Sequence, residues 1–293
     1  MISTFIKKHN LDNIFANNAR DYFVPLADDI KTRQAIANNT FFIGLNGCQG
    51  SGKSTLSEFL KEYLSKTYSL GVVVMSLDDF YISKDDRRLI ADQFHPLFNT
   101  RGVPATHNMA VLKAVLLALK HQQSTTIPSF NKVTDEPSPI SAWTEVVSAV
   151  DVVIVEGWCW GVTSQTPAQL AQAVNSLEAL EDPQAKWRTH VNLELSLNYQ
   201  PLYHLMDCWV MLKAPSFDNV LPWRLEQEQQ LAAATKNTQP TKLMDQRQIQ
   251  RFIQHFQRLT EQALETMANS CDHVFELSSS RAISAHRVKN SST

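Results

Sequence analysis

The segment Gly47–Ser54 constrains the fold more strongly than any other part of the 293-residue chain. It reads GCQGSGKS and fits the pattern G-x-x-x-x-G-K-[ST], between the apolar run FFIGLN (41–46) and a helix-like stretch from Lys53 to Lys66. Glycine is otherwise scarce: the chain has 8, where average usage would give roughly 20, and four of them lie between Gly44 and Gly52. A buried strand, a glycine-rich loop and a helix in this order predict a phosphate-binding loop.

The residue types of this loop are those that phosphate binding requires. Backbone N–H groups of a glycine-rich loop point at phosphate oxygens, and the N-terminus of the following helix adds a partial positive charge. Lys53 is expected to reach the β- and γ-phosphates of ATP, and the Ser54 hydroxyl is expected to bind Mg²⁺. The residues expected to bind the nucleotide are Gly47, Cys48, Gln49, Gly50, Ser51, Gly52, Lys53, Ser54 and Thr55.

Apolar runs alternate with helical patterns along the rest of the chain. The runs predict buried strands at FFIGLN (41–46), VVVMS (72–76), VVIVEG (152–157), CWVMLK (208–213) and HVFEL (273–277), and a short edge strand at TTIPSF (125–130) because of its proline. Helical spacing predicts one or two helices in residues 1–40 and further helices around 109–119, 221–234 and 245–268. The serine-rich segment after residue 277 is expected to be frayed. The pattern indicates an α/β P-loop NTPase fold with a mainly parallel sheet, helices on both faces and insertions over the active site.

Charge and cysteine content exclude several classes of protein. With 27 basic and 29 acidic residues the net charge is −2, so no overall field favours nucleic acid or an anionic membrane as a partner. The four cysteines have neither zinc-site nor disulfide-framework spacing, which favours a reducing, cytoplasmic compartment. The first residues lack the apolar core of a signal peptide, and no apolar run is long enough for a membrane span.

Carboxylates follow two of the predicted strands. Asp78 and Asp79 come after VVVMS, and Glu156 lies at the end of VVIVEG. In open α/β sheets, ligands bind at the carboxyl ends of the strands. One carboxylate there can accept or orient the proton of an attacking hydroxyl while another supports Mg²⁺, and Glu156 resembles a Walker B acid. Acids that only cap a helix or lie in a solvated turn are the alternative interpretation.

Other nucleotide-binding classes lack their second motif here. A GTPase requires Asn-Lys-x-Asp to read guanine, and the segment from Asn131 to Asp135 misses that spacing by one residue. No DxxG follows the second strand. An oligomeric motor or helicase would require DNA-facing charge, which the balanced composition does not indicate.

Five segments in this order resemble the D-glycerate 3-kinase family and its bacterial and fungal relatives. They are GLNGCQGSGKST, SLDDFY, HPLFNTRGVPATHN, VVIVEGW and PSFDNVLPWRLEQE. That family belongs to a wider kinase group with uridine kinase, phosphoribulokinase and pantothenate kinase. The resemblance runs from about residue 40 to residue 277, and the SLDDFY and RGVPATH elements are more specific than the phosphate loop.

The resemblance implies roles for individual residues. Asp78 corresponds to the proposed general base, Asp79 would lie close to the metal with Ser54 and Glu156, and Arg224 resembles the lid arginine that covers the transferred phosphate. The implied catalytic residues are therefore Lys53, Asp78 and Arg224. The implied acceptor-binding residues are Asp78, Tyr81, Arg101, His107 and Lys132. Trp223 either stacks near the adenine or packs in the core.

The chain departs from the family pattern in the acceptor-binding region. Relatives usually read GTHD where this chain has Ala105-Thr106-His107-Asn108, and they carry an aspartate at the position of Asn131. The segment after Lys132 has Asp135-Glu136-Pro137 where many relatives carry an arginine. Arg87 and Arg88 are expected at a solvated, charged start of a helix.

The sequence therefore predicts an ATP-dependent phosphotransferase that acts on a hydroxyl of a small metabolite. The best single acceptor is D-glycerate, giving 3-phosphoglycerate. The alternatives are another acceptor, such as a nucleoside, sugar phosphate or pantothenate-like molecule, or a regulatory nucleotide-binding protein. Residues 1–293 are expected to form a single P-loop kinase domain, with an N-terminal extension (1–40), an acceptor-binding region (80–145) and an insertion that can act as a cap (158–205).

Overall fold

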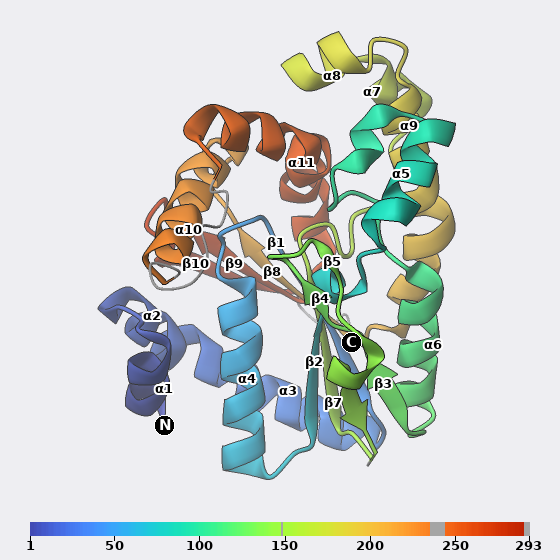
Figure 1. Ribbon diagram of the computed structural model, residues 1–293. Helices are drawn as coiled ribbons and strands as arrows, with labels where there is room; N and C mark the ends of the chain where they lie inside the picture. Colours follow the sequence, from blue (N-terminus) through green and yellow to red (C-terminus); the bar gives the residue numbers. More distant parts are fainter. Residues whose placement is uncertain (148, 235–243, 290–293) are drawn as a thin grey trace.

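A six-stranded sheet forms the centre of the computed structural model, which describes residues 1–147, 149–234 and 244–289 (Figure 1). The strand order is β10-β9-β8-β1-β7-β2. Five strands are parallel and β10 runs antiparallel to β9, which confirms the predicted mainly parallel sheet. The bounds are β1 Phe41–Gly47, β2 Val72–Ser76, β7 Val152–Gly157, β8 Cys208–Lys213, β9 His273–Leu277 and β10 Ile283–Val288.

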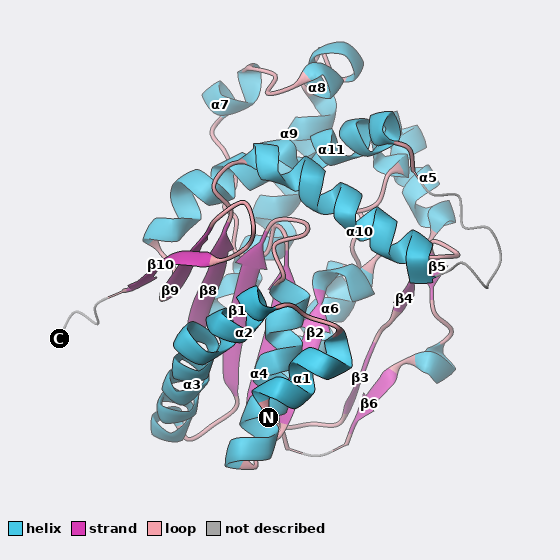
Figure 2. Ribbon diagram, turned by 90° about the vertical axis from the view of Figure 1, so that its left-hand side faces the viewer, coloured by secondary structure: helices cyan, strands magenta, loops and turns pink. Residues whose placement is uncertain are grey.

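Helices cover both faces of this sheet. One face carries α1 (Ile2–His9), α2 (Asn13–Asn18), α3 (Val24–Ala37) and α4 (Lys53–Tyr68), and the other carries α5 (Lys84–Gln93), α6 (Met109–Lys120) and α9 (Lys186–Glu194). Figure 2 shows α10 (Val220–Ala234) and α11 (Gln246–Thr266) above the end of the sheet at which β1 leads into the loop before α4. Two short helices, α7 (Pro167–Ala171) and α8 (Ser176–Glu181), extend beyond them.

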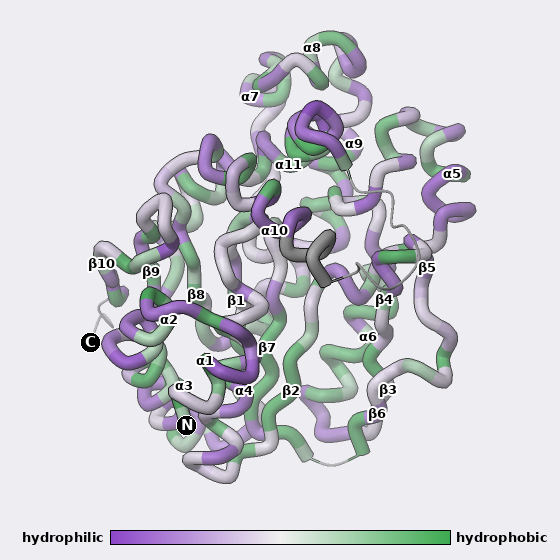
Figure 3. The backbone as a smooth tube through the Cα atoms, turned by 60° about the vertical axis from the view of Figure 1, so that its left-hand side comes forward, coloured by the Kyte–Doolittle hydropathy of each residue, from purple (hydrophilic) through white to green (hydrophobic). Residues whose placement is uncertain are grey.

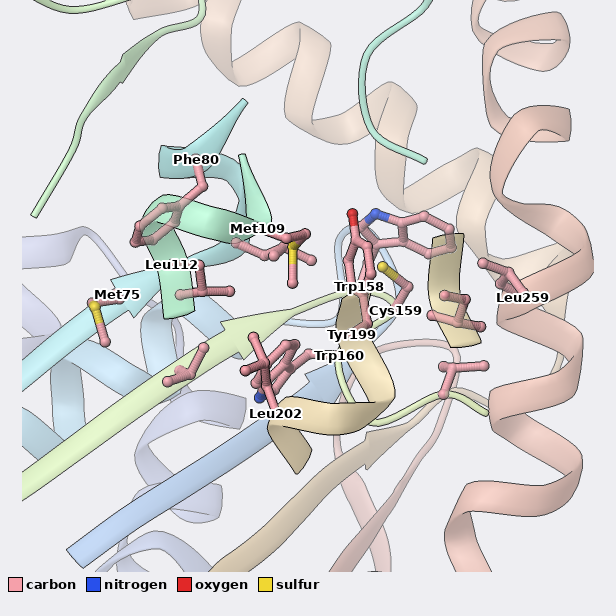
Figure 4. Close-up of a cluster of buried hydrophobic side chains, with 14 of the residues drawn as sticks. Met75, Phe80, Met109, Leu112, Trp158, Cys159, Trp160, Tyr199, Leu202 and Leu259 are labelled. Atoms are coloured by element: carbon pink, nitrogen blue, oxygen red, sulfur yellow. The ribbon is translucent and has the colours of Figure 1, made fainter. Parts of the chain in front are cut away.

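The sheet separates two hydrophobic clusters. Along β1, Phe42 belongs to one cluster, whereas Ile43 and Leu45 belong to the other. Strands with two buried faces read as continuous apolar runs, which is why β7 stands out in Figure 3 as a hydrophobic segment. Figure 4 shows part of the cluster on the α6 side, where Trp160 and Tyr199 are fully buried.

Two small antiparallel pairs lie outside the main sheet. β3 (Thr125–Ile127) pairs with β6 (Thr144–Val146), and β4 (Phe130–Asn131) pairs with β5 (Glu136–Pro137). The predicted strand at TTIPSF therefore ends before Pro128, because a proline has no N–H to continue a ladder.

Two expectations about the ends of the chain were wrong. Residues 1–40 form three helices rather than one or two: Asn10 ends α1 in a left-handed conformation, the Asp12 side chain caps α2, and a π-helical turn (Ala19–Phe23) leads into α3. The serine-rich segment is not frayed throughout, because Ile283–Val288 pairs with β9 as strand β10. Among the described residues, no helix is long and apolar enough to cross a membrane.

Candidate active site

The loop between β1 and α4 has the backbone geometry of an anion site. Gly52 precedes α4 with a φ of 95°, and no side chain in the described part of the structure caps the first turn of this helix. Gly50 has a φ of 77°, and a Cβ atom there would lie 2.5 Å from the Trp223 Cβ. Only glycine fits this close approach, so the loop can present its N–H groups inward. Burial raises the pKa of the Cys48 thiol to about 12, so Cys48 contributes backbone rather than a thiolate.

Glu156 lies beside the phosphate loop because β7 pairs with β1 in parallel register, with Leu45 opposite Glu156. Its Oε1 accepts a hydrogen bond of 2.7 Å from the Ser54 hydroxyl, and its Oε2 lies 3.8 Å from the Lys53 Nζ. The side chain is 4% exposed, and within the described part of the chain Oε2 has no hydrogen-bond partner. A buried carboxylate oxygen next to a serine hydroxyl fits Mg²⁺, which takes few protein ligands and completes its shell with phosphate oxygens and water.

Asp78 follows β2 in a 3-10 turn (Leu77–Phe80) and receives two hydrogen bonds. The Tyr81 hydroxyl donates to Oδ1 at 2.7 Å, and the Lys132 ammonium donates to Oδ2 at 2.6 Å. Burial raises the pKa of Asp78, but the positive charges of Lys132 and Lys53 lower it by more, so the pKa lies well below its usual range. Asp78 is therefore ionised at neutral pH.

Asp79 has a local role in the same turn. Its Oδ2 accepts from the Ser76 N–H at 3.0 Å, which completes a capping box. Burial, followed by the negative charges of Asp78 and Glu156, raises the pKa of Asp79 to about 6. Asp79 is absent from the lining of the cavity described below, and its role as a metal ligand stays a prediction.

Arg101 and His107, which both belong to the segment predicted to bind the acceptor, lie in different surroundings. The Arg101 guanidinium lies 5.6 Å from the Phe130 ring centroid and forms an ion pair with Asp135. His107 is buried, stacks on the Tyr81 ring at 4.6 Å, and its Nδ1 lies 2.7 Å from the Tyr199 hydroxyl. Burial lowers the pKa of His107 to about 3, so this histidine is neutral. Its ring packs against the Tyr81 ring and helps to fix the position of Tyr81.

One cavity brings together most of the predicted site residues. Its lining includes Lys53 and Ser54 from the loop, Glu156 from β7, and Arg224 from α10. Arg224 forms an ion pair with Glu228, and burial lowers its pKa. The predicted residues that line this cavity are Gln49, Gly50, Lys53, Ser54, Asp78, Tyr81, Arg101, Lys132, Glu156 and Arg224.

A second cavity adjoins the other side of the phosphate loop, where Gly50, Ser51, Gly52 and Thr55 line it. Its other walls come from the N-terminal segment around Asn10–Asn18, the middle of α10 (Glu226 and Gln227), and the turn between β9 and β10. The residues of the N-terminal wall are Asn10, Leu11, Asp12, Ile14, Phe15 and Asn18. The N-terminal extension (residues 1–40) thus contributes a wall to a cavity that the phosphate loop also lines.

Sequence reasoning missed Arg281, which connects the phosphate loop with α10 and the N-terminal segment. Its Nε donates to the Gly50 carbonyl at 2.7 Å, its guanidinium lies 5.1 Å from the Trp223 ring centroid, and its own carbonyl accepts from the Asn18 side chain at 2.9 Å. Nothing in the serine-rich sequence around Arg281 indicates that this side chain contacts the phosphate loop, which lies more than 200 residues earlier in the chain.

Two further residues differ from expectation. Arg87 is not solvated: it is 1% exposed, and it donates to the carbonyls of Ile82 (2.8 Å) and Asn99 (3.4 Å) and to the Asp135 carboxylate (2.7 Å). Arg88 is exposed, as expected. Of the two alternatives for Trp223, the structure shows packing, since the ring is 3% exposed and its N–H donates to the Ser279 carbonyl.

Part of the chain matches a known family of kinases. Residues 42–182 match the family described as "Phosphoribulokinase / Uridine kinase family". This part of the chain, a little under half of its length, is thus similar to that family of kinases. The matched segment holds the phosphate loop, Asp78, Arg101 and Glu156, whereas Arg224 and the N-terminal wall of the second cavity lie outside it.

Two curated relatives extend the similarity. The chain is 29% identical over 246 residues to the uncharacterized kinase mug58 of Schizosaccharomyces pombe, covering 78% of this chain and 83% of the relative. It is 28% identical over 226 residues to the chloroplastic D-glycerate 3-kinase of Arabidopsis thaliana, covering 71% of this chain and 47% of the relative. The chain thus matches about half the length of the Arabidopsis protein.

Solved structures share the fold. The D-glycerate 3-kinase of Cryptococcus neoformans superposes with a TM-score of 0.77 at 24% identity, covering 91% of this chain and 99% of that one. The YGR205w protein superposes with a TM-score of 0.75 at 23% identity, covering 92% of this chain and 97% of that one. The chain has the fold of P-loop kinases, and both the predicted fold class and the predicted resemblance are confirmed.

Proposed function

We propose that the protein transfers the γ-phosphoryl group of ATP to a hydroxyl of a small metabolite, with D-glycerate as the best candidate acceptor and 3-phosphoglycerate as the product. The observation that carries the proposal is one cavity lined at the same time by the phosphate-loop Lys53, the carboxylate of Asp78 and the guanidinium of Arg101. Glycerate has a carboxylate for Arg101 and a terminal hydroxyl for Asp78. The similarity to two D-glycerate 3-kinases supports this choice.

The acceptor hydroxyl would donate its proton to the Asp78 carboxylate while its oxygen attacks the γ-phosphorus, and ADP would leave. Arg101 can hold a carboxylate with two parallel hydrogen bonds, which fixes the direction of the hydroxyl. Because the pKa of Asp78 is depressed, this group is a weak base and would act chiefly by orienting the hydroxyl. That suits a loose transition state, in which proton removal is late and positioning matters most.

Charge that develops on the transferred phosphoryl group would be stabilised by Lys53 from the loop and by Arg224 from α10, which line the same cavity. Mg²⁺, held by Ser54 and Glu156 and assisted by Asp79, would neutralise charge on the β- and γ-phosphates. The nucleoside of ATP would occupy the second cavity, beyond Gly50–Thr55. Phe15 and Leu11 offer an apolar wall there, and Asn10 and Asp12 offer polar groups.

An acceptor panel tests the proposal directly. Purified protein with ATP and Mg²⁺ is given D-glycerate, uridine, pantothenate or ribulose 5-phosphate, and ADP release and product mass are measured. We expect D-glycerate to raise ADP release above the basal rate and to yield 3-phosphoglycerate, and we expect Lys53→Ala to abolish that increase. If no acceptor raises ADP release, the proposed reaction is wrong.

A further inference from the structure

Asp135 joins the acceptor pocket to a buried arginine behind it. Its carboxylate accepts from the Arg101 guanidinium on one oxygen and from the Arg87 guanidinium on the other, the latter at 2.7 Å. Arg101 lines the cavity that holds Asp78 and Lys53, whereas Arg87 is 1% exposed. We call these three residues the Arg87–Asp135–Arg101 bridge.

A buried counter-charge holds the Asp135 carboxylate in addition to Arg101. Arg87 is anchored by the carbonyls of Ile82 and Asn99. Moving the carboxylate would leave this buried guanidinium without a counter-charge, which is strongly unfavourable. The Arg87–Asp135–Arg101 bridge is therefore expected to stay intact during turnover.

The turn that carries Asp135 is also fixed. Asp135 has a φ of 60°, and its N–H donates to the Asn131 carbonyl at 2.8 Å. The Asn131 side chain accepts from the N–H groups of Val133 and Thr134, and the Lys84 ammonium donates to the Thr134 carbonyl at 2.8 Å. A non-glycine residue in the left-handed region is uncommon and must be held there by its surroundings. The position of the carboxylate is thus determined by the turn as well as by its two arginines.

The charges on the acceptor side of the cavity can then be counted. Two guanidinium groups and one carboxylate give the Arg87–Asp135–Arg101 bridge a net charge of +1. Lys132 and Asp78 form an ion pair whose net charge is zero. Lys53 lies against Glu156 and Arg224 pairs with Glu228, so each of these two pairs also has a net charge of zero. Among these charged side chains of the described residues, the acceptor side therefore has one net positive charge.

We propose that Asp135 determines how much negative charge the acceptor may carry, and that it restricts the site to acceptors with one negative charge, such as hydroxy-carboxylates. A phosphate ester carries a charge of about −1.5 to −2 at pH 7. This charge is larger than the single net positive charge of the acceptor side, and the Asp135 carboxylate would repel the ester. The inference rests on the proposed kinase function and disfavours sugar phosphates among the alternative acceptors. Without Asp135, the bridge would present +2 and would accommodate a dianion.

This inference is tested with three hydroxyl compounds that share a three-carbon skeleton and differ in charge: glycerol, D-glycerate and glycerol phosphate. Values of kcat/KM are measured for the wild type and for Asp135→Asn, because asparagine tolerates a positive φ and keeps the hydrogen-bonding oxygen. The matched control is Glu136→Gln, which removes the same charge from the next residue, whose carboxylate accepts from the Lys84 N–H instead of an arginine. Thermal melting shows whether each variant is folded.

We expect the wild type to prefer D-glycerate, and Asp135→Asn to raise the kcat/KM of glycerol phosphate relative to D-glycerate by about tenfold. Glu136→Gln should leave that ratio within about twofold of the wild type. An unchanged ratio in Asp135→Asn, or an equal change in Glu136→Gln, would overturn the assignment. So would a wild type that uses glycerol phosphate better than D-glycerate, and that result does not depend on any variant.

Calorimetric binding of D-glycerate and glycerol phosphate separates this inference from the proposed reaction. A wild type that binds D-glycerate without phosphorylating it contradicts the reaction. In that case, a tenfold change in the ratio of the two Kd values for Asp135→Asn still supports the role of Asp135, and an unchanged ratio refutes it. A wild type that binds neither compound refutes both proposals.

Discussion

Replacing Asp78 with asparagine tests the acceptor side of the site most directly. The carboxylate accepts hydrogen bonds from Tyr81 (2.7 Å) and from Lys132 (2.6 Å) and balances the lysine charge. An asparagine has only one accepting oxygen, so its NH₂ group would face another donor, and the acceptor hydroxyl would lose its anionic partner. The change is isosteric, and the loss of turnover therefore reports charge and orientation rather than a cavity.

The size of the effect follows from the pKa. General-base residues contribute about 10²- to 10⁴-fold, and a carboxyl group whose pKa lies well below its usual range belongs at the low end. We expect kcat with D-glycerate to fall about 100-fold, equivalent to about 2.7 kcal/mol in the activation free energy, while KM for ATP changes little. Because Asp78 is ionised from weakly acidic pH upwards, the fall should be constant between pH 6 and 9.

Steady-state kinetics over that pH range provide the measurement, with thermal melting as a check on folding. Asp86→Asn is the matched control, since Asp86 is an exposed acid at the start of α5 and outside the cavity. It should retain the wild-type kcat. Full turnover by Asp78→Asn with the true acceptor would refute the role assigned to this carboxylate.

Three further predictions concern stability and the donor site. Ala105 has a φ of 84°, so Ala105→Gly should stabilise the fold by about 0.5–1 kcal/mol in chemical denaturation; a loss of stability would contradict the strain. The pKa of Asp79 is raised to about 6, so its ionisation costs stability as pH rises from about 4 through 6; Asp79→Asn should remove that fall in melting temperature, and an unchanged pH profile would contradict this cause. Arg281→Gln removes a charge-assisted hydrogen bond to the Gly50 carbonyl, so KM for ATP should rise about tenfold while KM for the acceptor stays constant; equal changes in both would show a general loss of structure instead.

Much of the fold was predictable because its signals are local. The strands β1, β2, β7, β8 and β9 were predicted from their apolar runs, since strands buried on both faces must be apolar throughout and even the partly buried edge strand β2 is rich in valine. The weaker strand β10 was not, because its polar sequence is held in place by pairing with β9. The three-helix arrangement of residues 1–40 likewise depends on where Asn10 and Asp12 end and begin helices.

The same distinction between local and long-range signals applies to where the site residues lie. Lys53, Ser54, Asp78 and Glu156 were predicted because each lies in a short motif next to a strand end, and parallel strands bring such ends to one edge of the sheet. The expectation that Arg87 is solvated failed, because burial of a charged side chain depends on a distant counter-charge.

The sequence by itself determined that this chain builds a parallel sheet around a phosphate loop, because strand, glycine loop and helix are consecutive and their pattern is set by backbone sterics and burial. Only the tertiary structure decided which charges meet. Asp135 lies 34 residues from Arg101 and Arg281 lies 231 residues from Gly50, and no periodicity or motif connects such positions. The electrostatics of the acceptor pocket and the tie between the carboxyl-terminal segment and the phosphate loop arise from long-range contacts, whose energies depend on distance and burial in the folded chain.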